Sequence, residues 1–322
     1  MQSEDRILAT RDSPTPLIDE TLSDTLYYAR CDASVKFFYM ENGGYHGGMG
    51  DPDRLHIPAL VYHQVLSDGM PVRPRRPDEG LVSGQIYLEQ FIRQMDYLAE
   101  QGFTTITGRQ LVPWLEGAAD LPARPVVVDF DDHSMISYKN ALPVLRERGQ
   151  TATMFVISGV ADGDPWLDGN PLADTEAWSV ARMRWRELEK LVEAGWDIAA
   201  HTRTHWFLTD LPETPEGDAR IMDELVRGKQ DIEENLGVSP THFGYPNGLW
   251  NERIEAMVKQ VYRSARHATN TGPAEYITQQ TNPYRLPTMN INHHLSFDAF
   301  RSLVDRTDPS REYFVQPVAT GT

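Results

Sequence analysis

Residues 125–157, PVVVDFDDHSMISYKNALPVLRERGQTATMFVI, contain the most informative pattern in the chain. An apolar run leads into an acidic cluster, and apolar residues at helical spacing then continue to Gly149. A second apolar run, residues 151–157, follows directly. A strand, a helix and another strand in this order are typical of a parallel β/α unit.

The same pattern recurs on both sides of this stretch. Each further segment with helical spacing is followed by a short apolar run that we interpret as a strand. These predicted helices cover residues 87–102, 185–195, 219–237 and 251–261. Repeated units without a domain-sized break predict an α/β fold, a single (β/α) barrel over residues 57–322. In such barrels the functional residues lie at the carboxyl ends of the strands.

Composition excludes several classes of protein. The chain has 322 residues and a formal net charge of −17, which disfavours nucleic acid as a partner. It contains no apolar run of the length that spans a membrane. Cys31 is the only cysteine, so an internal disulfide and a cysteine-based zinc site are both excluded.

The N-terminal part lacks the repeated pattern. Residues 1–56 are predicted to be an irregular extension, and they end in a glycine-rich stretch. The first 20 residues contain no basic and apolar segments of the kind that form a signal peptide. Residues 158–180 are rich in Gly, Asp and Pro and are predicted to be a loop over the site, with Trp166 and Trp178 as candidate substrate contacts.

Titratable side chains follow the ends of several predicted strands. Residues 129–133 read DFDDH, and residues 201–205 read HTRTH. Two histidines four residues apart lie on one side of a helical turn, where they can share a cation. A ligand set of His, His and Asp suits Zn²⁺, and Ni, Co or Fe would also accept it. Helix-capping histidines and an acidic helix start remain the alternative interpretation of these two motifs.

Taken together, these motifs resemble those of the polysaccharide deacetylase family, the NodB-homology enzymes of carbohydrate esterase family 4. The family motif T-F-D-D-G corresponds to Asp129–His133, and its H-[ST]-x-x-H motif corresponds to His201–His205. The segments IPALVYHQV, FGYPNG and YRLPTMNI resemble the branch that acts on poly-N-acetylglucosamine. The resemblance extends over residues 57–305 and implies a distorted (β/α) barrel of the NodB type.

The resemblance implies a role for each matching residue. The positions of the metal ligands are Asp132, His201 and His205. Asp131 is at the position of the general base, and His63 is at that of the general acid. The turn Tyr245–Pro246–Asn247 corresponds to the motif that lines the groove and offers a backbone N–H to the oxyanion.

Several positions depart from the family pattern. His133 replaces a glycine and is a candidate additional ligand or substrate contact, and Asp129 replaces the usual threonine. Gly244 stands where many members have an arginine, so Arg285 is a candidate cation near Asp131. Sugar-stacking candidates are Trp206, Phe207, Tyr245 and Trp250.

The sequence therefore predicts a hydrolase, dependent on one divalent metal ion, that removes N-acetyl groups from a polysaccharide or oligosaccharide containing N-acetylglucosamine. A hydrolase of small linear or cyclic amides and a catalytically impaired carbohydrate-binding homologue remain as alternatives. No nucleic acid partner and no membrane span are expected, and the oligomeric state stays open. The family points to the cell surface or the exterior, whereas the absent signal peptide keeps a cytoplasmic location open.

Overall fold

The computed structural model describes residues 55–72, 84–161, 181–269 and 274–307. The predicted N-terminal extension lies outside these residues except for its last two positions. Of the predicted loop 158–180, only residues 158–161 are described, so the expectations for Trp166 and Trp178 also fall outside.

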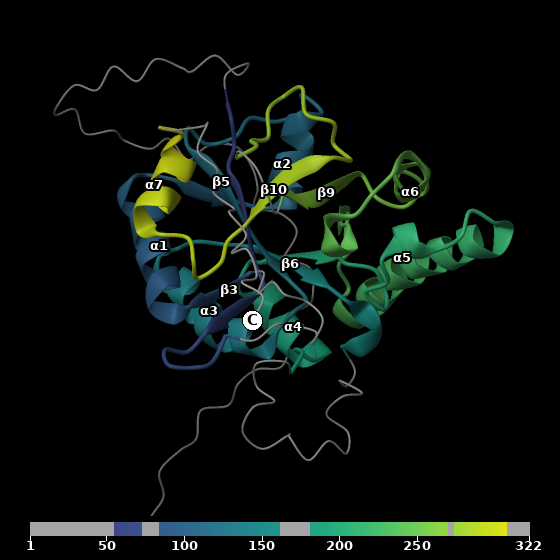
Figure 1. Cartoon of the computed structure of the whole chain (residues 1–322), viewed down its shortest axis with the longest axis horizontal. Helices are drawn as coiled ribbons and strands as arrows, with labels where there is room; N and C mark the ends of the chain where they lie inside the picture. The colour runs from purple at the N-terminus through teal and green to yellow at the C-terminus, as the bar shows by residue number, and fades with distance from the viewer. Residues whose placement is uncertain (1–54, 73–83, 162–180, 270–273, 308–322) are drawn as a thin grey trace, which may run out of the picture. The chain divides into compact units, whose positions relative to one another are not determined.

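Seven parallel strands form a closed ring (Figure 1). Around the ring they are β1 (Ala59–Tyr62), β5 (Pro125–Asp131), β6 (Thr153–Val156), β7 (Asp197–Ala200), β8 (His242–Gly244), β9 (Ser264–Thr269) and β10 (Leu286–Asn290). Closure occurs at β1, where Leu60 is in register with Met289 of β10 and with Val128 of β5. The predicted (β/α) barrel is thereby confirmed.

Among the described residues, three short strands lie outside the ring. They are β4 (Thr104–Ile106), which pairs with the start of β5, and the two-stranded pair β2 (Gln64–Leu66) and β3 (Gln85–Tyr87). The last two follow the C-terminal end of β1, so they extend the barrel on the side where the site is expected.

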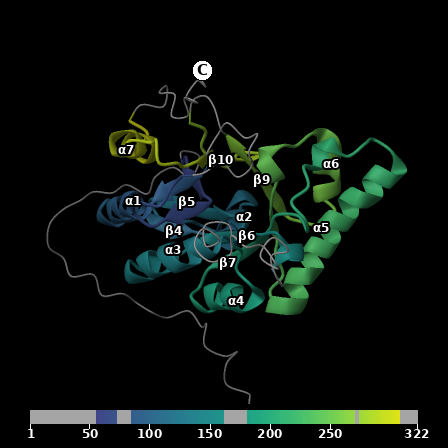
Figure 2. The ribbon, with the colours of Figure 1, turned by 60° about the horizontal axis from the view of Figure 1, so that its bottom comes forward.

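Helices surround the strands (Figures 1 and 2). They are α1 (Leu88–Glu100), α2 (Gly108–Leu115), α3 (Met135–Glu147), α4 (Trp185–Glu193), α5 (Pro215–Leu236), α6 (Glu252–Val258) and α7 (Phe297–Asp305). Six of them contact one another in the order α7, α1, α3, α4, α5, α6. No helix among the described residues is long and apolar enough to cross a membrane.

Strand β5 shows how the sequence separates the two faces of the barrel wall. Alternate residues of a strand point to opposite faces. Phe130 points outward, where its ring makes an edge-to-face contact with Phe91 of α1, with the ring centroids 5.9 Å apart. Asp129 and Asp131 point inward, where both meet Arg266 of β9. The apolar run therefore packs against the helices while its two carboxylates enter the barrel.

Helix α2 closes the N-terminal end of the barrel. Arg109 pairs with Asp197 at the start of β7, and Gly108 lies against His242 at the start of β8. An apolar cluster around Leu111 and Trp114 fills the space below the inward carboxylates. The C-terminal ends of the strands are thus the end of the barrel at which the site is built.

Acid should weaken the fold through His242. Its ring is buried, and its Nδ1 lies 2.6 Å from the Oγ of Ser264. Burial, reinforced by Arg266, lowers the pKa of His242 to about 3. In the unfolded chain a histidine has a pKa of about 6.5 and therefore binds a proton that the folded state excludes. The free energy of unfolding should therefore fall as the pH drops below about 6.5, the pKa of a histidine in the unfolded chain.

We expect His242 to contribute a loss of about 2 kcal/mol in unfolding free energy between pH 6.5 and 4.5. Urea unfolding of the wild type and of His242→Gln at both pH values measures this contribution. The glutamine variant should show the smaller decrease. Equal decreases in the two proteins would mean that His242 titrates normally in the folded state.

Candidate metal centre

Asp132, His201 and His205 come together at the C-terminal ends of β5 and β7. One ligand atom from each lies within 4.8 Å of the others. The Oδ1 atom of Asp132 is 3.4 Å from Nε2 of His205 and 3.7 Å from Nε2 of His201. The structure therefore brings the three predicted ligands into one group that is large enough for a cation.

The donor chemistry of this group fits a divalent metal. Nδ1 of His201 lies 2.8 Å from the carbonyl oxygen of Gly244, so Nδ1 carries the proton and donates it to that oxygen. The lone pair is then on Nε2, which faces Asp132. Metal-ligating histidines usually have this arrangement, in which a second hydrogen bond fixes the tautomer and the ring orientation.

The loop after β7 is not the helical turn that the H-x-x-x-H spacing predicts. Thr202 and His205 both have positive φ, at 61° and 62°. The buried carboxylate of Glu224 on α5 accepts hydrogen bonds from the backbone N–H groups of Arg203 and Thr204 at 3.0 and 2.8 Å. These contacts fold the loop over α5, so the two histidines meet through loop geometry rather than helical periodicity.

Unusual backbone conformations are concentrated around the site. Of the six described non-glycine residues with positive φ, all but Arg306 lie at strand ends around the site, namely Asp132, His133, Thr202, His205 and Asn247. Such conformations are costly for residues with a Cβ atom, and they cluster where a site constrains the backbone. This concentration supports the C-terminal ends of the strands as the functional edge of the barrel.

His63 and Asp131 face each other beside the three-residue group. Nε2 of His63 is 3.7 Å from Oδ2 of Asp131, which is 3.9 Å from Nε2 of His201. The backbone of His63 is fixed from one side by α3, where the hydroxyl of Ser137 donates to its carbonyl oxygen at 3.0 Å. Gly84 packs against its ring so closely that a Cβ atom there would lie 2.0 Å from Nδ1.

Arg266 connects the two inward carboxylates of β5. It donates to Oδ1 of Asp131, and its Nε lies 3.1 Å from Oδ2 of Asp129. Its guanidinium also stacks 3.9 Å above the ring of Phe155. The arginine is buried, so its position is set by these contacts.

This arrangement separates the pKa values of the two carboxyl groups. Burial by itself would raise the pKa of Asp131, but Arg266, His201 and His63 outweigh it and hold that pKa below its usual value. Burial raises the pKa of Asp129 to about 7, in spite of Arg266. Asp131 is therefore ionised at neutral pH and able to accept a proton.

The cation beside Asp131 is Arg266 and not Arg285, which the sequence suggested for that place. Nε of Arg285 donates to the buried carboxylate of Glu255 on α6, and its guanidinium stacks 4.2 Å from Trp250. Gly244, where many family members carry an arginine, is in direct register with Arg266 on the neighbouring strand. A Cβ atom at Gly244 would lie 2.8 Å from the ring of Phe155, so this strand has no room for a side chain at that layer.

His133 is buried behind the three-residue group and does not belong to it. Its Nδ1 accepts a hydrogen bond from the backbone N–H of Ile157 at 3.3 Å. Burial, followed by the charge of Arg182, lowers the pKa of His133 well below its usual value. Arg182 also donates to the carbonyl oxygen of Asp132 at 2.9 Å, which steadies the backbone of that residue.

The turn after β8 presents a single backbone donor. The N–H of Tyr245 donates to the carbonyl oxygen of Arg266 at 3.1 Å, and Pro246 has no N–H. Asn247 is exposed, and its N–H has no bond to the residues that the structure describes. The ring of Tyr245 is buried in the core, whereas Trp206 beside His205 has 47% of its surface exposed. Of these two predicted sugar contacts, the structure presents only the Trp206 ring to solvent.

The comparisons with known proteins concern the family and the fold. Residues 118–264 match the family model for polysaccharide deacetylase. This segment is therefore a polysaccharide deacetylase domain by the family model, and it spans somewhat less than half of the chain. Both carboxylates of β5 and both histidines of the 201–205 loop lie within the matched deacetylase segment, whereas His63 precedes it.

Two named relatives match most of the length of this chain. It is 24% identical over 268 residues to the poly-β-1,6-N-acetyl-D-glucosamine N-deacetylase of Staphylococcus epidermidis, covering 78% of this chain and 82% of the relative. The enzyme of the same name from Staphylococcus aureus is 23% identical over 227 residues, covering 69% and 72% of the two chains.

Solved structures of deacetylases share the fold. The Streptococcus pyogenes deacetylase PplD, in complex with acetate, superimposes with a TM-score of 0.61 at 18% identity, covering 78% of this chain and 98% of the other. IcaB from Ammonifex degensii superimposes with a TM-score of 0.58 at 21% identity, covering 78% and 96%.

Proposed function

We propose that this protein is a metal-dependent de-N-acetylase of poly-N-acetylglucosamine or a closely related N-acetylated polysaccharide. The observation that carries the proposal is the three-residue group Asp132, His201 and His205 beside the facing pair His63 and Asp131. The names of the staphylococcal relatives support the substrate class.

The three ligands would hold one divalent cation, most simply Zn²⁺, although this donor set also accepts Ni, Co or Fe. Such an ion supplies Lewis-acid chemistry: it polarises a carbonyl oxygen and lowers the pKa of water. Three protein ligands leave coordination positions for substrate and water, as expected of a catalytic rather than a structural site.

Asp131 is proposed as the general base. Its ionised carboxylate accepts a proton from the water molecule that attacks the acetyl carbonyl carbon. Its Oδ1 is held by Arg266, which leaves Oδ2 directed toward His63 and His201. Arg266 therefore acts as a positioning residue for the base.

His63 is proposed as the general acid. As the bond between the carbonyl carbon and the amide nitrogen breaks, an imidazolium at this position gives its proton to the leaving amine. The products are acetate and a free amino group on the sugar. The N–H of Asn247 is proposed to donate to the oxyanion, an interaction whose loss typically costs about 2.7–4 kcal/mol of transition-state stabilisation.

Acetate release from a substrate panel tests this function. The panel contains poly-β-1,6-N-acetylglucosamine, chitin oligomers, peptidoglycan and small cyclic amides. We expect release from the first and little or none from the cyclic amides. Turnover of the cyclic amides alone would favour a small-amide hydrolase, and no release from any substrate by metal-loaded protein would favour a carbohydrate-binding homologue.

Arg266→Lys should lower kcat by about 10- to 100-fold with little change in KM. Lysine keeps the positive charge but lacks the planar fork that reaches both Asp129 and Asp131, and small errors in the position of a catalytic group cost up to about 100-fold in rate. Steady-state acetate release measures both constants. Arg263→Lys is the matched control, because Arg263 is exposed and pairs with Glu116. A change in KM alone would contradict the positioning role.

A further inference from the structure

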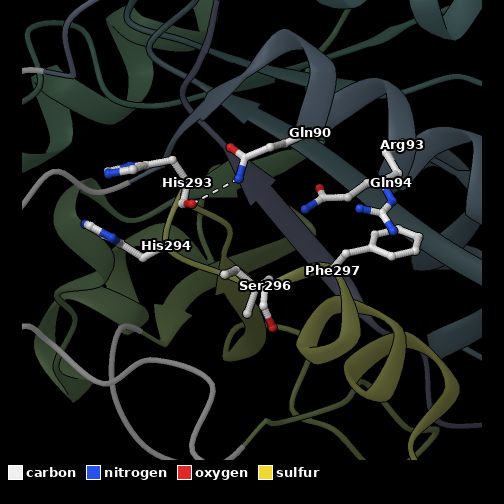
Figure 3. Close-up of a pocket in the computed structure, with 8 residues that line it drawn as sticks. Gln90, Arg93, Gln94, His293, His294, Ser296 and Phe297 are labelled. Carbon is white, nitrogen blue, oxygen red and sulfur yellow. Dashed lines mark hydrogen bonds between the residues drawn. The ribbon is translucent and has the colours of Figure 1, made fainter.

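A cavity of about 140 Å³ lies between α1, the segment after β10 and the start of α7 (Figure 3). That volume holds about five water molecules, enough for a compact polar group. None of the lining residues is acidic, although the chain has a net charge of −17. They are Gln90, Arg93, Gln94, His293, His294, Leu295, Ser296 and Phe297.

The side-chain amide oxygens in this cavity already have hydrogen-bond donors. Oε1 of Gln90 accepts from the N–H of Tyr87 at 3.3 Å, and Oε1 of Gln94 accepts from the hydroxyl of Tyr62 at 2.7 Å. The carbonyl oxygen of His293 accepts from Nε2 of Gln90 at 3.0 Å. With these acceptors in use, the two side-chain amides present donors to the cavity, and the rings of His293 and His294 add nitrogens that can donate or accept.

The amide nitrogen of Gln94 is the clearest of the remaining donors. Only 2% of this residue is exposed, and Nε2 makes no hydrogen bond to any residue that the structure describes. Figure 3 shows the Gln94 amide directed into the cavity. An amide N–H group without a protein partner is able to donate to an acceptor that enters the cavity.

Arg93 and the start of α7 add positive potential. The guanidinium of Arg93 stacks 3.9 Å from the ring of Phe297 and makes no ion pair within the described part of the chain. Ser296 caps α7 by accepting from the N–H of Ala299 at 3.2 Å, so the first-turn N–H groups of α7 lie beside the cavity. Helix N-termini and guanidinium groups both favour anions.

A backbone hydrogen bond and a packing contact connect the cavity to the proposed catalytic site. The N–H of His293 donates to the carbonyl oxygen of Gln85 at 2.7 Å, and the preceding residue, Gly84, packs against the ring of His63. The lining of the cavity is therefore linked to the ring of His63 through the Gly84–Gln85 segment.

We infer that this cavity is a subsite for an anionic substituent, a carboxylate or phosphate ester carried by the bound saccharide. The inference rests on the proposed function, which implies that the ligand is a saccharide. It also rests on the donors of Arg93, Gln94 and α7, which favour a negative charge on that ligand. Such a subsite would make the deacetylation reaction selective for polysaccharides that carry an anionic substituent.

Calorimetric titration of the metal-loaded protein with N-acetylglucosamine 6-phosphate and with N-acetylglucosamine tests the subsite. We expect the phosphorylated sugar to bind about tenfold more tightly or better, as one charge-assisted hydrogen bond can provide. Arg93→Gln and Gln94→Glu should each remove this advantage. Glutamate at position 94 keeps the acceptor for Tyr62 but places a negative charge toward the anion.

Arg186→Gln is the matched control, because this exposed arginine on α4 pairs with Glu187 and its loss changes the net charge equally. Equal binding of the two sugars, or an advantage that survives in Arg93→Gln, would overturn the subsite. Inorganic phosphate that binds as tightly as the sugar phosphate would overturn the claim that the anion is carried by a saccharide. Since binding is measured without turnover, a protein that binds as expected but releases no acetate would refute only the proposed catalytic function.

Discussion

Asp131→Asn should retain its metal and lose nearly all acetate release. Asparagine has nearly the same shape and still offers an oxygen to Arg266, but it cannot accept a proton from water. Positioned general bases contribute about 100- to 10,000-fold to a rate, and we expect kcat to fall by about 1,000-fold. The bound metal should be unchanged, because Asp131 is outside the three-residue ligand group.

Elemental analysis and acetate release are both measured on the same preparation of Asp131→Asn. Together they separate the binding of the metal, proposed for Asp132, from the acceptance of a proton, proposed for Asp131. Asp120→Asn is the control, since Asp120 is exposed and lies after α2. Wild-type activity in Asp131→Asn would refute the assignment of Asp131 as the base. Loss of metal together with activity would instead make Asp131 a ligand.

His201→Ala should lose both the metal and the activity. Its Nε2 faces Asp132, and its Nδ1 is held by the carbonyl oxygen of Gly244. Removing it would leave two of the three proposed ligands, fewer than the three typical of catalytic zinc sites. Loss of second-sphere partners alone weakens metal binding by 10- to 100-fold, so loss of a ligand should weaken it by at least about 100-fold.

Competition with a metal-sensitive chelator dye measures the affinity of His201→Ala. His56→Ala is the control, because this histidine is exposed and outside the group. The variant should also keep a circular dichroism spectrum like that of the wild type, which separates loss of metal from loss of fold. Unchanged metal affinity in folded His201→Ala would refute its assignment as a ligand.

The carboxyl ends of the strands were the most predictable part of this protein. Asp131 follows an apolar run and His201 follows another, so the parallel β/α pattern alone predicted that they would lie at one edge. The structure brings them within 3.9 Å of each other. Local sequence was sufficient here because each motif directly follows the strand that positions it.

Arg266 could not be located in the same way. It lies in β9, 135 positions from Asp131 along the chain, and only closure of the barrel brings the two together. The one available signal was an arginine within a short run of small residues that forms a strand. The same limit applies to Gln94 and Arg93, whose positions on α1 acquire meaning only when the segment after β10 packs beside them.

The HTRTH loop shows where periodicity misled the prediction. The spacing of His201 and His205 is compatible with a helical turn, yet the backbone at His205 has positive φ. The carboxylate that holds this loop is Glu224, which is in the middle of a long helix and has no mark in the sequence as a loop contact. Tertiary hydrogen bonds, rather than local propensity, decided the conformation.

Metal-dependent acetate release from poly-β-1,6-N-acetylglucosamine tests the central claim most directly. The protein is stripped with a chelator, dialysed, and assayed before and after addition of one equivalent of Zn²⁺, with the bound metal measured in each sample. We predict background release from the stripped protein and recovery in proportion to the bound metal. Undiminished release by protein shown to be metal-free would contradict the account.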